Sequence, residues 1–196
     1  MSILENSFTA LPETAKEVTA IAQQIEKQQG STTVLLKKQA TKQHLTTHLL
    51  KQPFQFVHIA THSLLNYYDH RFSALACYPQ PTIQSHLYFS NELQFQDIHA
   101  DLVVLSSCES GVGQLWIGEG LLALHRSFIY SGAKNVLFSL WKVSDIYSSQ
   151  LMIDFYKYYL QGMSYTSALR TAKLEMLQHP VGAQPKYWAA FILMGE

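Results

Sequence analysis

A histidine and a cysteine each follow an apolar run that has the character of a buried strand. His62 comes directly after the run 54–60 and its following threonine, and Cys108 follows the run 101–106. A cysteine is the strongest side-chain nucleophile once its thiol has lost its proton, and a neighbouring imidazole can accept that proton. The two side chains could therefore carry out acyl transfer if the fold brings them together.

Acyl transfer also needs hydrogen-bond donors for the negative charge that develops on the carbonyl oxygen. The backbone N–H groups of Ser63 and Cys108 would be presented by turns at the ends of their strands and could supply these donors. Glycines just beyond the cysteine, at Gly111 and Gly113, would let a substrate backbone approach closely. The pattern predicts an oxyanion site next to the thiol.

The alternative interpretation is that neither side chain is reactive. Cys108 could be a small buried apolar residue, and His62 could be a strand-end histidine bonded to the backbone. Cys77 lies in a stretch without a strand end or glycine loop, so we interpret it as a packing residue. His58 lies inside the run 54–60 and is typical of a core histidine with satisfied hydrogen bonds.

The glycines after Cys108 do not complete a nucleotide-binding motif. The third glycine of a dinucleotide fingerprint would fall at Trp116. Gly113 and Gly118 have the spacing of a phosphate-binding loop, but Glu119 stands where that loop requires a lysine. Nucleotide binding is therefore disfavoured as a function.

The elements that must position His62 and Cys108 alternate between strand and helix along the chain. Periodicity and capping residues predict helices at 12–29, 41–50, 121–130, 144–160 and 164–178. Apolar runs predict strands at 32–36, 54–60, 87–89, 101–106, 135–140 and 188–194. This alternation predicts an α/β fold, in which helices cover both faces of a mostly parallel central sheet. Ligands of such sheets bind where loops leave the carboxyl ends of the strands, which is where both residues lie.

Composition excludes several classes of function. The 196 residues contain 14 Lys+Arg and 14 Asp+Glu, so the formal net charge is 0, and only 14% of residues are charged. Recognition of nucleic acid or of a membrane surface needs a clustered basic face, and the densest basic stretch, Lys37, Lys38 and Lys42, is short. We therefore expect no nucleic acid and no membrane among the partners, and the low charge indicates that part of the surface meets another protein segment.

Length and apolar content predict one domain with a short tail. We expect residues 1–10 to be a tail or linker and residues 11–196 to form a single domain. Residues 1–10 lack the pattern of a signal peptide, and the longest apolar run, 188–194, is too short to span a membrane. Two cysteines make neither a disulfide framework nor a zinc motif. The expected location is the cytoplasm.

Several stretches in order resemble one family. They are FVHIATH at 56–62, LSSCESGVG at 105–113, GEG at 118–120, SLWKVSD at 139–145, LMIDFY at 151–156 and YWAAF at 187–191. Together they resemble the CHAT domain, a caspase-like peptidase family that is also related to metacaspases and separase, and the similarity extends over residues 11–196. The histidine precedes the cysteine by 108 − 62 = 46 residues, which is similar to the spacing in caspases.

The resemblance implies a caspase-like three-layer sandwich with a catalytic dyad at His62 and Cys108. The expected function is that of a cysteine endopeptidase that hydrolyses peptide bonds in a protein substrate and needs no metal or organic cofactor. CHAT domains commonly follow tetratricopeptide repeats, so the expected regulator is such a repeat region in the same chain or a separate protein.

Substrate preference would be set by the loop 140–145, which leaves a core strand at the catalytic edge. Trp141, Asp145 and Asp69 are candidate substrate-binding residues, and either acid would favour a basic side chain before the cut. Asp145 also fits a simpler role at the start of a helix. A rival hypothesis is an inactive caspase-like module that binds a partner, because Ser63 stands where family members usually have glycine.

Overall fold

The chain forms a four-stranded main sheet, sheet A, with a smaller sheet beyond one of its edges. A computed structural model describes residues 11–66, 68–80, 85–106, 108–109 and 119–196, with the backbone alone for 108–109 and 119–123. Sheet A has the order β1 (Phe54–Ile59), β5 (Ala100–Leu105), β7 (Ala133–Ser139) and β8 (Phe191–Gly195). The first three strands are parallel and β8 is antiparallel to β7. The expected α/β class with a mostly parallel sheet is confirmed.

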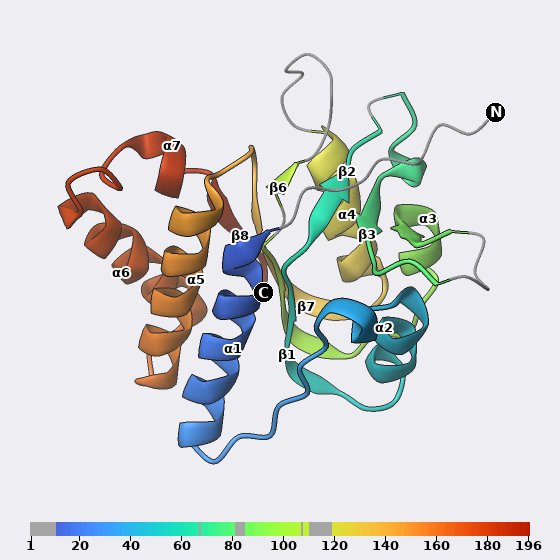
Figure 1. Cartoon of the computed structure of the whole chain (residues 1–196), viewed down its shortest axis with the longest axis horizontal. Helices are drawn as coiled ribbons and strands as arrows, with labels where there is room; N and C mark the ends of the chain where they lie inside the picture. Colours follow the sequence, from blue (N-terminus) through green and yellow to red (C-terminus); the bar gives the residue numbers. More distant parts are fainter. Residues whose placement is uncertain (1–10, 67, 81–84, 107, 110–118) are drawn as a thin grey trace.

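Helices cover both faces of sheet A (Figure 1). On one side lie α1 (Pro12–Lys27), α5 (Asp145–Leu160) and α6 (Tyr165–Gln178), with α7 (Pro185–Trp188) at their end. On the other side lie α2 (Lys42–Leu49), α3 (Ser90–Leu93) and α4 (Glu119–Tyr130). Short 3-10 turns η1 (Lys37–Gln39) and η2 (His70–Phe72) lie in the connections. The result is a three-layer sandwich.

The central strand β5 shows why the core has two halves. Leu102 and Val104 pack into the cluster formed with α1, α5 and α6, whereas Val103 and Leu105 pack into the cluster formed with α2 and α4. All four side chains are buried. A strand covered on both faces needs a continuous apolar run, which is the pattern that its sequence shows.

The smaller sheet B extends the fold beyond the carboxyl ends of two strands of sheet A. Its order is β4 (Leu87–Phe89), β3 (Ala74–Ala76), β2 (His62–Leu64) and β6 (Cys108–Glu109). Strand β2 follows β1 along the chain, and β6 follows β5 in the same way. The predicted strand at 87–89 is confirmed, whereas β2, β3 and β6 were not expected from the sequence.

One expected strand is wrong. Residues 32–36 form no strand, and they are mostly exposed or half-buried. A strand needs a neighbour for its backbone N–H and C=O groups, and sheet A ends at β1 in the observed order. The expected strand at 188–194 begins later, at Phe191, because Trp188 belongs to α7.

Caps and turns follow the chemistry of their residues. Thr41 precedes α2, and its hydroxyl accepts the N–H of His44 at 3.2 Å, as the sequence predicted for a helix start. Gly132 ends α4 with a φ of 108°, a conformation that L side chains rarely adopt.

Within the described residues, no helix combines the length and apolar character needed to cross a membrane.

Replacing Gly132 by alanine is expected to destabilise the fold by about 2 kcal/mol. The new Cβ would lie 2.6 Å from the backbone oxygen of Ile98, in addition to the strain at this φ. Gly162→Ala is the matched control, because Gly162 has a φ of 96° but no atom within 4 Å of the added Cβ. Urea unfolding of both variants measures the difference, and equal losses of stability would show that the clash with Ile98 is unimportant.

The antiparallel strand β8 is the last strand of sheet A on its side. The N–H of Leu140 donates to the carbonyl of Ala190 at 2.9 Å, so the carbonyl of the next residue, Phe191, points away from β7. The ammonium of Lys173 on α6 donates to this outward carbonyl at 2.6 Å.

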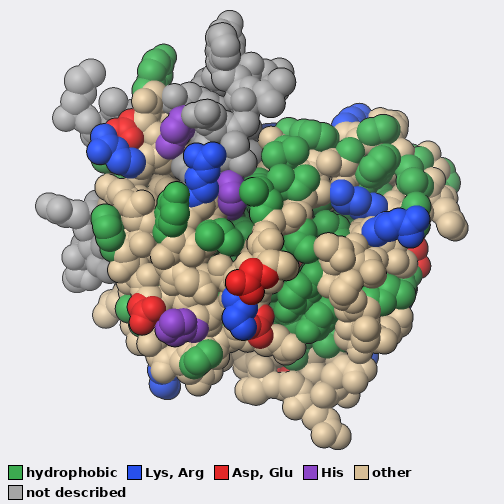
Figure 2. Space-filling model, turned by 180° about the vertical axis from the view of Figure 1, so that it is seen from behind, with side chains coloured by type: hydrophobic (Ala, Val, Ile, Leu, Met, Phe, Trp, Pro, Cys, Tyr) green, Lys and Arg blue, Asp and Glu red, His purple; other side chains and the backbone are tan. Residues whose placement is uncertain are grey.

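Figure 2 shows many hydrophobic and few charged side chains on the rear face of the molecule. This agrees with the low charge of the sequence.

Candidate active site

The two candidate catalytic residues are partners in neighbouring parallel strands. His62 of β2 pairs with Cys108 of β6, and in sheet A, Ile59 pairs with Leu105. His62 lies three positions after Ile59, and Cys108 lies three positions after Leu105. The register between β1 and β5 is therefore kept between β2 and β6. Adjacent strands lie about 4.8 Å apart, which places the two backbones at the distance of direct neighbours.

Ser63 lies in the interior of sheet B. Its strand β2 has β3 on one side and β6 on the other, and the Ser63 side chain is fully buried. Among the described residues, the non-glycine residues with positive φ are Gln29 and Lys37, so Ser63 is not in the conformation that requires glycine. The serine is therefore compatible with the backbone at this position.

Asp145 is the first residue of α5 and directly follows the loop that connects β7 to this helix. Its Oδ2 accepts the backbone N–H of Glu13, in the first turn of α1, at 3.2 Å. Burial raises the pKa of Asp145, the bond from Glu13 lowers it, the charges of Glu17 and Glu13 raise it, and the interaction with His62 lowers it. The net result is a raised pKa for Asp145, with burial as the main cause.

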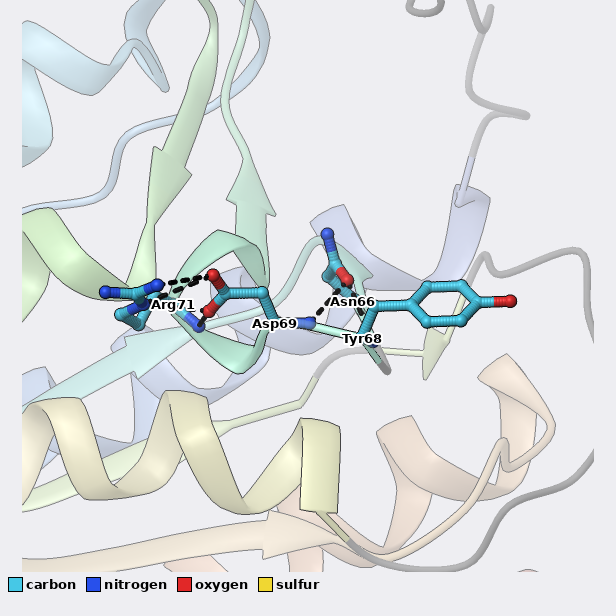
Figure 3. Close-up of polar contacts among 4 residues, drawn as sticks. All are labelled: Asn66, Tyr68, Asp69 and Arg71. Atoms are coloured by element: carbon cyan, nitrogen blue, oxygen red, sulfur yellow. Dashed lines mark hydrogen bonds and ion pairs between the residues drawn. The ribbon is translucent and has the colours of Figure 1, made fainter.

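Asp69 lies in the loop that follows β2 and immediately precedes η2. Its carboxylate accepts hydrogen bonds from Nε of Arg71 at 2.9 Å, from Nη2 at 2.7 Å and from the backbone N–H of Arg71 at 3.1 Å, and this partner holds the pKa of Asp69 below its usual value. The carbonyl oxygen of the Asn66 side chain accepts the N–H groups of Tyr68 and Asp69, both at 3.0 Å. Figure 3 shows these contacts and the Tyr68 ring pointing outward, away from them. The Asp69 carboxylate is already paired within its own loop.

Trp141 lies in the loop between β7 and α5 and is 36% exposed. Its indole N–H donates to the carbonyl of Lys186 in α7 at 3.1 Å. The loop that carries Trp141 and Asp145 is therefore fixed at both ends, by α7 and by α1. A fixed loop with a half-exposed indole could form one wall of a substrate pocket.

A buried polar network lies between α1, β1 and α5. Nε2 of His58 lies 2.9 Å from Oε1 of Glu17, and its Nδ1 lies 3.3 Å from the hydroxyl of Tyr156. The expectation that His58 is a satisfied core histidine is confirmed. Burial, followed by the charge of Glu17, raises the pKa of Tyr156 well above its usual value, so this hydroxyl keeps its proton. Sequence reasoning missed Glu17, although it lies four residues before the buried Ile21 on the same helix face.

Cys77 packs with the core between sheet A, α2 and α4, as expected. Burial raises the pKa of its thiol to about 11, and the positive charge of Lys42 only partly opposes this effect. Cys77 is thus an unreactive thiol at neutral pH.

No group of three His, Cys, Asp or Glu residues suited to a metal ion is found in the part of the chain that the structure describes. The glycines of the segment 110–118 lie outside the described residues.

Comparison with known proteins gives a family and two relatives. The family model described as CHAT domain matches residues 3–196. Tetratricopeptide repeat protein 28 from Mus musculus is 31% identical over 116 residues, which is 59% of this chain and 5% of that protein. The Homo sapiens protein of the same name is 30% identical over 116 residues, with the same coverage. The chain thus spans a small part of the length of these relatives.

Proposed function

The chain belongs to the CHAT domain family, and from this premise we propose that it is a cysteine endopeptidase whose catalytic dyad is His62 and Cys108. The pairing of these two residues across β2 and β6 carries the proposal. A family related to caspase-like peptidases supplies the expected chemistry, and the observed register supplies the proximity that this chemistry needs. The substrate is a protein or peptide, and the residues of the dyad act without a metal or organic cofactor.

The proposed reaction follows from the two side chains. His62 takes the proton of the Cys108 thiol, and the thiolate attacks the carbonyl carbon of the scissile peptide bond. The backbone N–H groups of Ser63 and Cys108 are proposed to stabilise the oxyanion of the tetrahedral intermediate. His62 then gives its proton to the leaving amine, and a water molecule, deprotonated by His62, releases the acyl group from the sulfur.

The substrate residue on the N-terminal side of the scissile peptide bond is proposed to be basic. The loop with Trp141 and Asp145 would form one wall of the pocket, and Asp69 would lie on the opposite side of β2. Because the carboxylate of Asp69 is bonded to Arg71, Asp145 is the better candidate for a substrate cation. An uncharged indole beside a carboxylate also suits the long apolar stem of a lysine or arginine.

Regulation by a repeat region is a separate part of the proposal. Both relatives are named for tetratricopeptide repeats and are far longer than this chain. We propose that such repeats, in the same chain or in another protein, control access to the site in the cytoplasm, where a free thiol nucleophile stays reduced. A surface with few charged residues is compatible with the binding of such a partner.

A second candidate function is that of an inactive module that binds a partner. Ser63 favours it, because this residue replaces the usual glycine and lies between two paired strands. In such a module the thiol of Cys108 would have ordinary reactivity.

Alkylation of the native protein with limiting iodoacetamide at pH 6 tests the proposed dyad. We expect Cys108 to react at least about 100-fold faster than Cys77, because an activated thiol is ionised at this pH, whereas an ordinary one with a pKa near 8.5 is mostly protonated. Cys77, with its pKa of about 11, is an internal reference that stays unmodified. The adduct is located by peptide mass.

The His62→Ala variant is the control for activation. Its Cys108 should react as slowly as an ordinary thiol, while the modification of Cys77 remains unchanged. A wild-type Cys108 that is no faster than in His62→Ala would contradict the dyad and favour the inactive module.

A further inference from the structure

We propose that α1 is a regulatory helix, which detaches from the rest of the fold as one unit and, while docked, holds the proposed active site in its competent form. The buried contact between Glu17 of α1 and His58 of β1 secures the docked position. The effect on activity rests on the proposed dyad of His62 and Cys108, whereas the detachment of α1 does not depend on that dyad.

Apolar burial attaches α1 only weakly. Its buried apolar side chains are Ile21, which is 3% exposed, and the small Ala22. The neighbouring helix α5, in contrast, buries Leu151, Met152 and Phe155 completely. An element with few buried apolar contacts opens at a lower free energy than the whole protein unfolds. We therefore expect α1 to open while α5 stays in place.

The contact between Glu17 and His58 makes the docking of α1 all-or-none. Glu17 is 1% exposed, and its Oε1 lies 2.9 Å from Nε2 of His58, whose Nδ1 lies 3.3 Å from the hydroxyl of the buried Tyr156. A small shift of α1 would leave the carboxylate and the imidazole buried without each other, which is unfavourable. Full detachment returns both groups to water. A helix held in this way has a docked and a detached state, with no stable position between them.

The docked α1 contacts elements on both sides of the proposed site. His58 lies in β1, and His62 follows it by four positions. The N–H of Glu13 donates to Oδ2 of Asp145 at 3.2 Å, and Asp145 directly follows the loop that is proposed to form a wall of the pocket. Figure 1 shows α1 beside α5, with the start of α1 toward the end of sheet A from which β2 and β6 continue.

Detachment of α1 would remove support from both of these elements at once. Among the described residues of sheet A, β1 pairs with β5 and has no second strand neighbour. A looser β1 would place His62 less well, and transfer of the proton from Cys108 needs the imidazole within hydrogen-bond distance of the thiol. The docked state is therefore the reactive one, and a signal that detaches α1 lowers the reactivity of Cys108.

Hydrogen exchange of the backbone amides in the intact protein tests whether α1 detaches on its own. We expect the amides of α1 to exchange at least about tenfold faster than those of β5. Gly132→Ala, which destabilises the fold at the start of β7, should speed exchange in β5 about 30-fold, the factor that corresponds to its expected loss of stability. It should leave exchange in α1 unchanged. Equal acceleration in α1 and β5 would show that α1 opens only with the whole fold and would overturn the proposal.

The double variant Glu17→Ala with Ile21→Ala tests the link to the dyad. It removes the buried carboxylate and the large buried apolar side chain that hold α1. We expect α1 to lose its protection against exchange while β5 stays protected, and the alkylation of Cys108 at pH 6 to become at least about tenfold slower. An unprotected α1 with wild-type alkylation would contradict the regulation. A variant that unfolds as a whole, or an α1 that stays protected, would contradict the detachment.

Thr19→Ala with Gln23→Ala is the matched control, because both side chains are exposed on the same helix. It should keep the wild-type exchange and alkylation. A wild-type Cys108 that reacts at pH 6 as slowly as in His62→Ala would contradict the dyad and with it the regulation, whereas exchange in α1 would still decide whether the helix detaches. Failure of the two proposals can thus be told apart.

Discussion

A Cys108→Ala variant is expected to lose peptide hydrolysis by at least about 1000-fold, because it lacks the atom that forms the acyl bond. The loss should appear in kcat, since a methyl group in place of the thiol leaves the binding surface nearly intact. The measurement is the appearance of new peptide N-termini in a mixture of unfolded proteins, which offers every type of cleavage sequence at once. The far-ultraviolet circular dichroism spectrum should remain that of the wild type.

Cys77→Ala is the matched control for this loss. It removes the other thiol from a packed region and should retain hydrolysis, at a modest cost in stability. If both the wild type and Cys108→Ala lack hydrolysis but bind the same partner equally well, the endopeptidase proposal is wrong and the binding module is supported. Hydrolysis that persists in Cys108→Ala would show that another residue is the nucleophile.

Glu17→Ala is expected to lower the free energy of unfolding by about 3 kcal/mol. Glu17 is 1% exposed, and the variant would leave Nε2 of His58 without its carboxylate at 2.9 Å. A buried polar group that loses its partner suffers the full cost of leaving water. Urea unfolding monitored by fluorescence gives the change directly.

The conservative variant Glu17→Gln separates hydrogen bonding from side-chain removal. Its amide can still bond to His58 and fills nearly the same volume, so it should recover more than half of the stability lost in Glu17→Ala. The triple variant Glu17→Leu, His58→Leu and Tyr156→Phe should also be more stable than Glu17→Ala, because no polar member of this network then remains unpaired. If Glu17→Ala matches the wild type in stability, the network between α1 and β1 contributes nothing to the fold.

The strands of sheet A could be predicted because their signal is local. The run at 101–106 is apolar on both strand faces, and this composition follows from helices that cover both sides. Thr41 indicated the start of α2 through its hydroxyl, and Gly132 indicated the end of α4 through its backbone freedom. The segment 32–36 has suitable residues for a strand but no neighbour to pair with, and a single sequence does not reveal that lack.

Sheet B could not be predicted in the same way. Strand β2 begins with a histidine and a serine, and the described part of β6 is two residues long. Such segments become strands because β1 and β5 already hold them side by side, so their conformation is imposed by the tertiary structure. The neighbourhood of His62 and Cys108 could still be anticipated, because both follow strands of one parallel sheet.

The surroundings of the site depend on contacts that are distant in sequence. The bond between Glu13 and Asp145 joins residues 132 positions apart, and the pair of Glu17 and His58 is separated by 41. Neither follows from the spacing of motifs. The pairing of Asp69 with Arg71, by contrast, is local and could have indicated that this carboxylate is already bound.

The capped outer edge of β8 has a consequence for self-assembly. An exposed strand edge can template the addition of another chain and so lead to open-ended aggregates. A strand that approached Phe191 would have to displace the ammonium of Lys173 from the outward carbonyl, and it would leave a half-buried cation without its acceptor. Lys173 on α6 thereby makes the addition of a strand at Phe191, on the β8 edge of sheet A, less favourable.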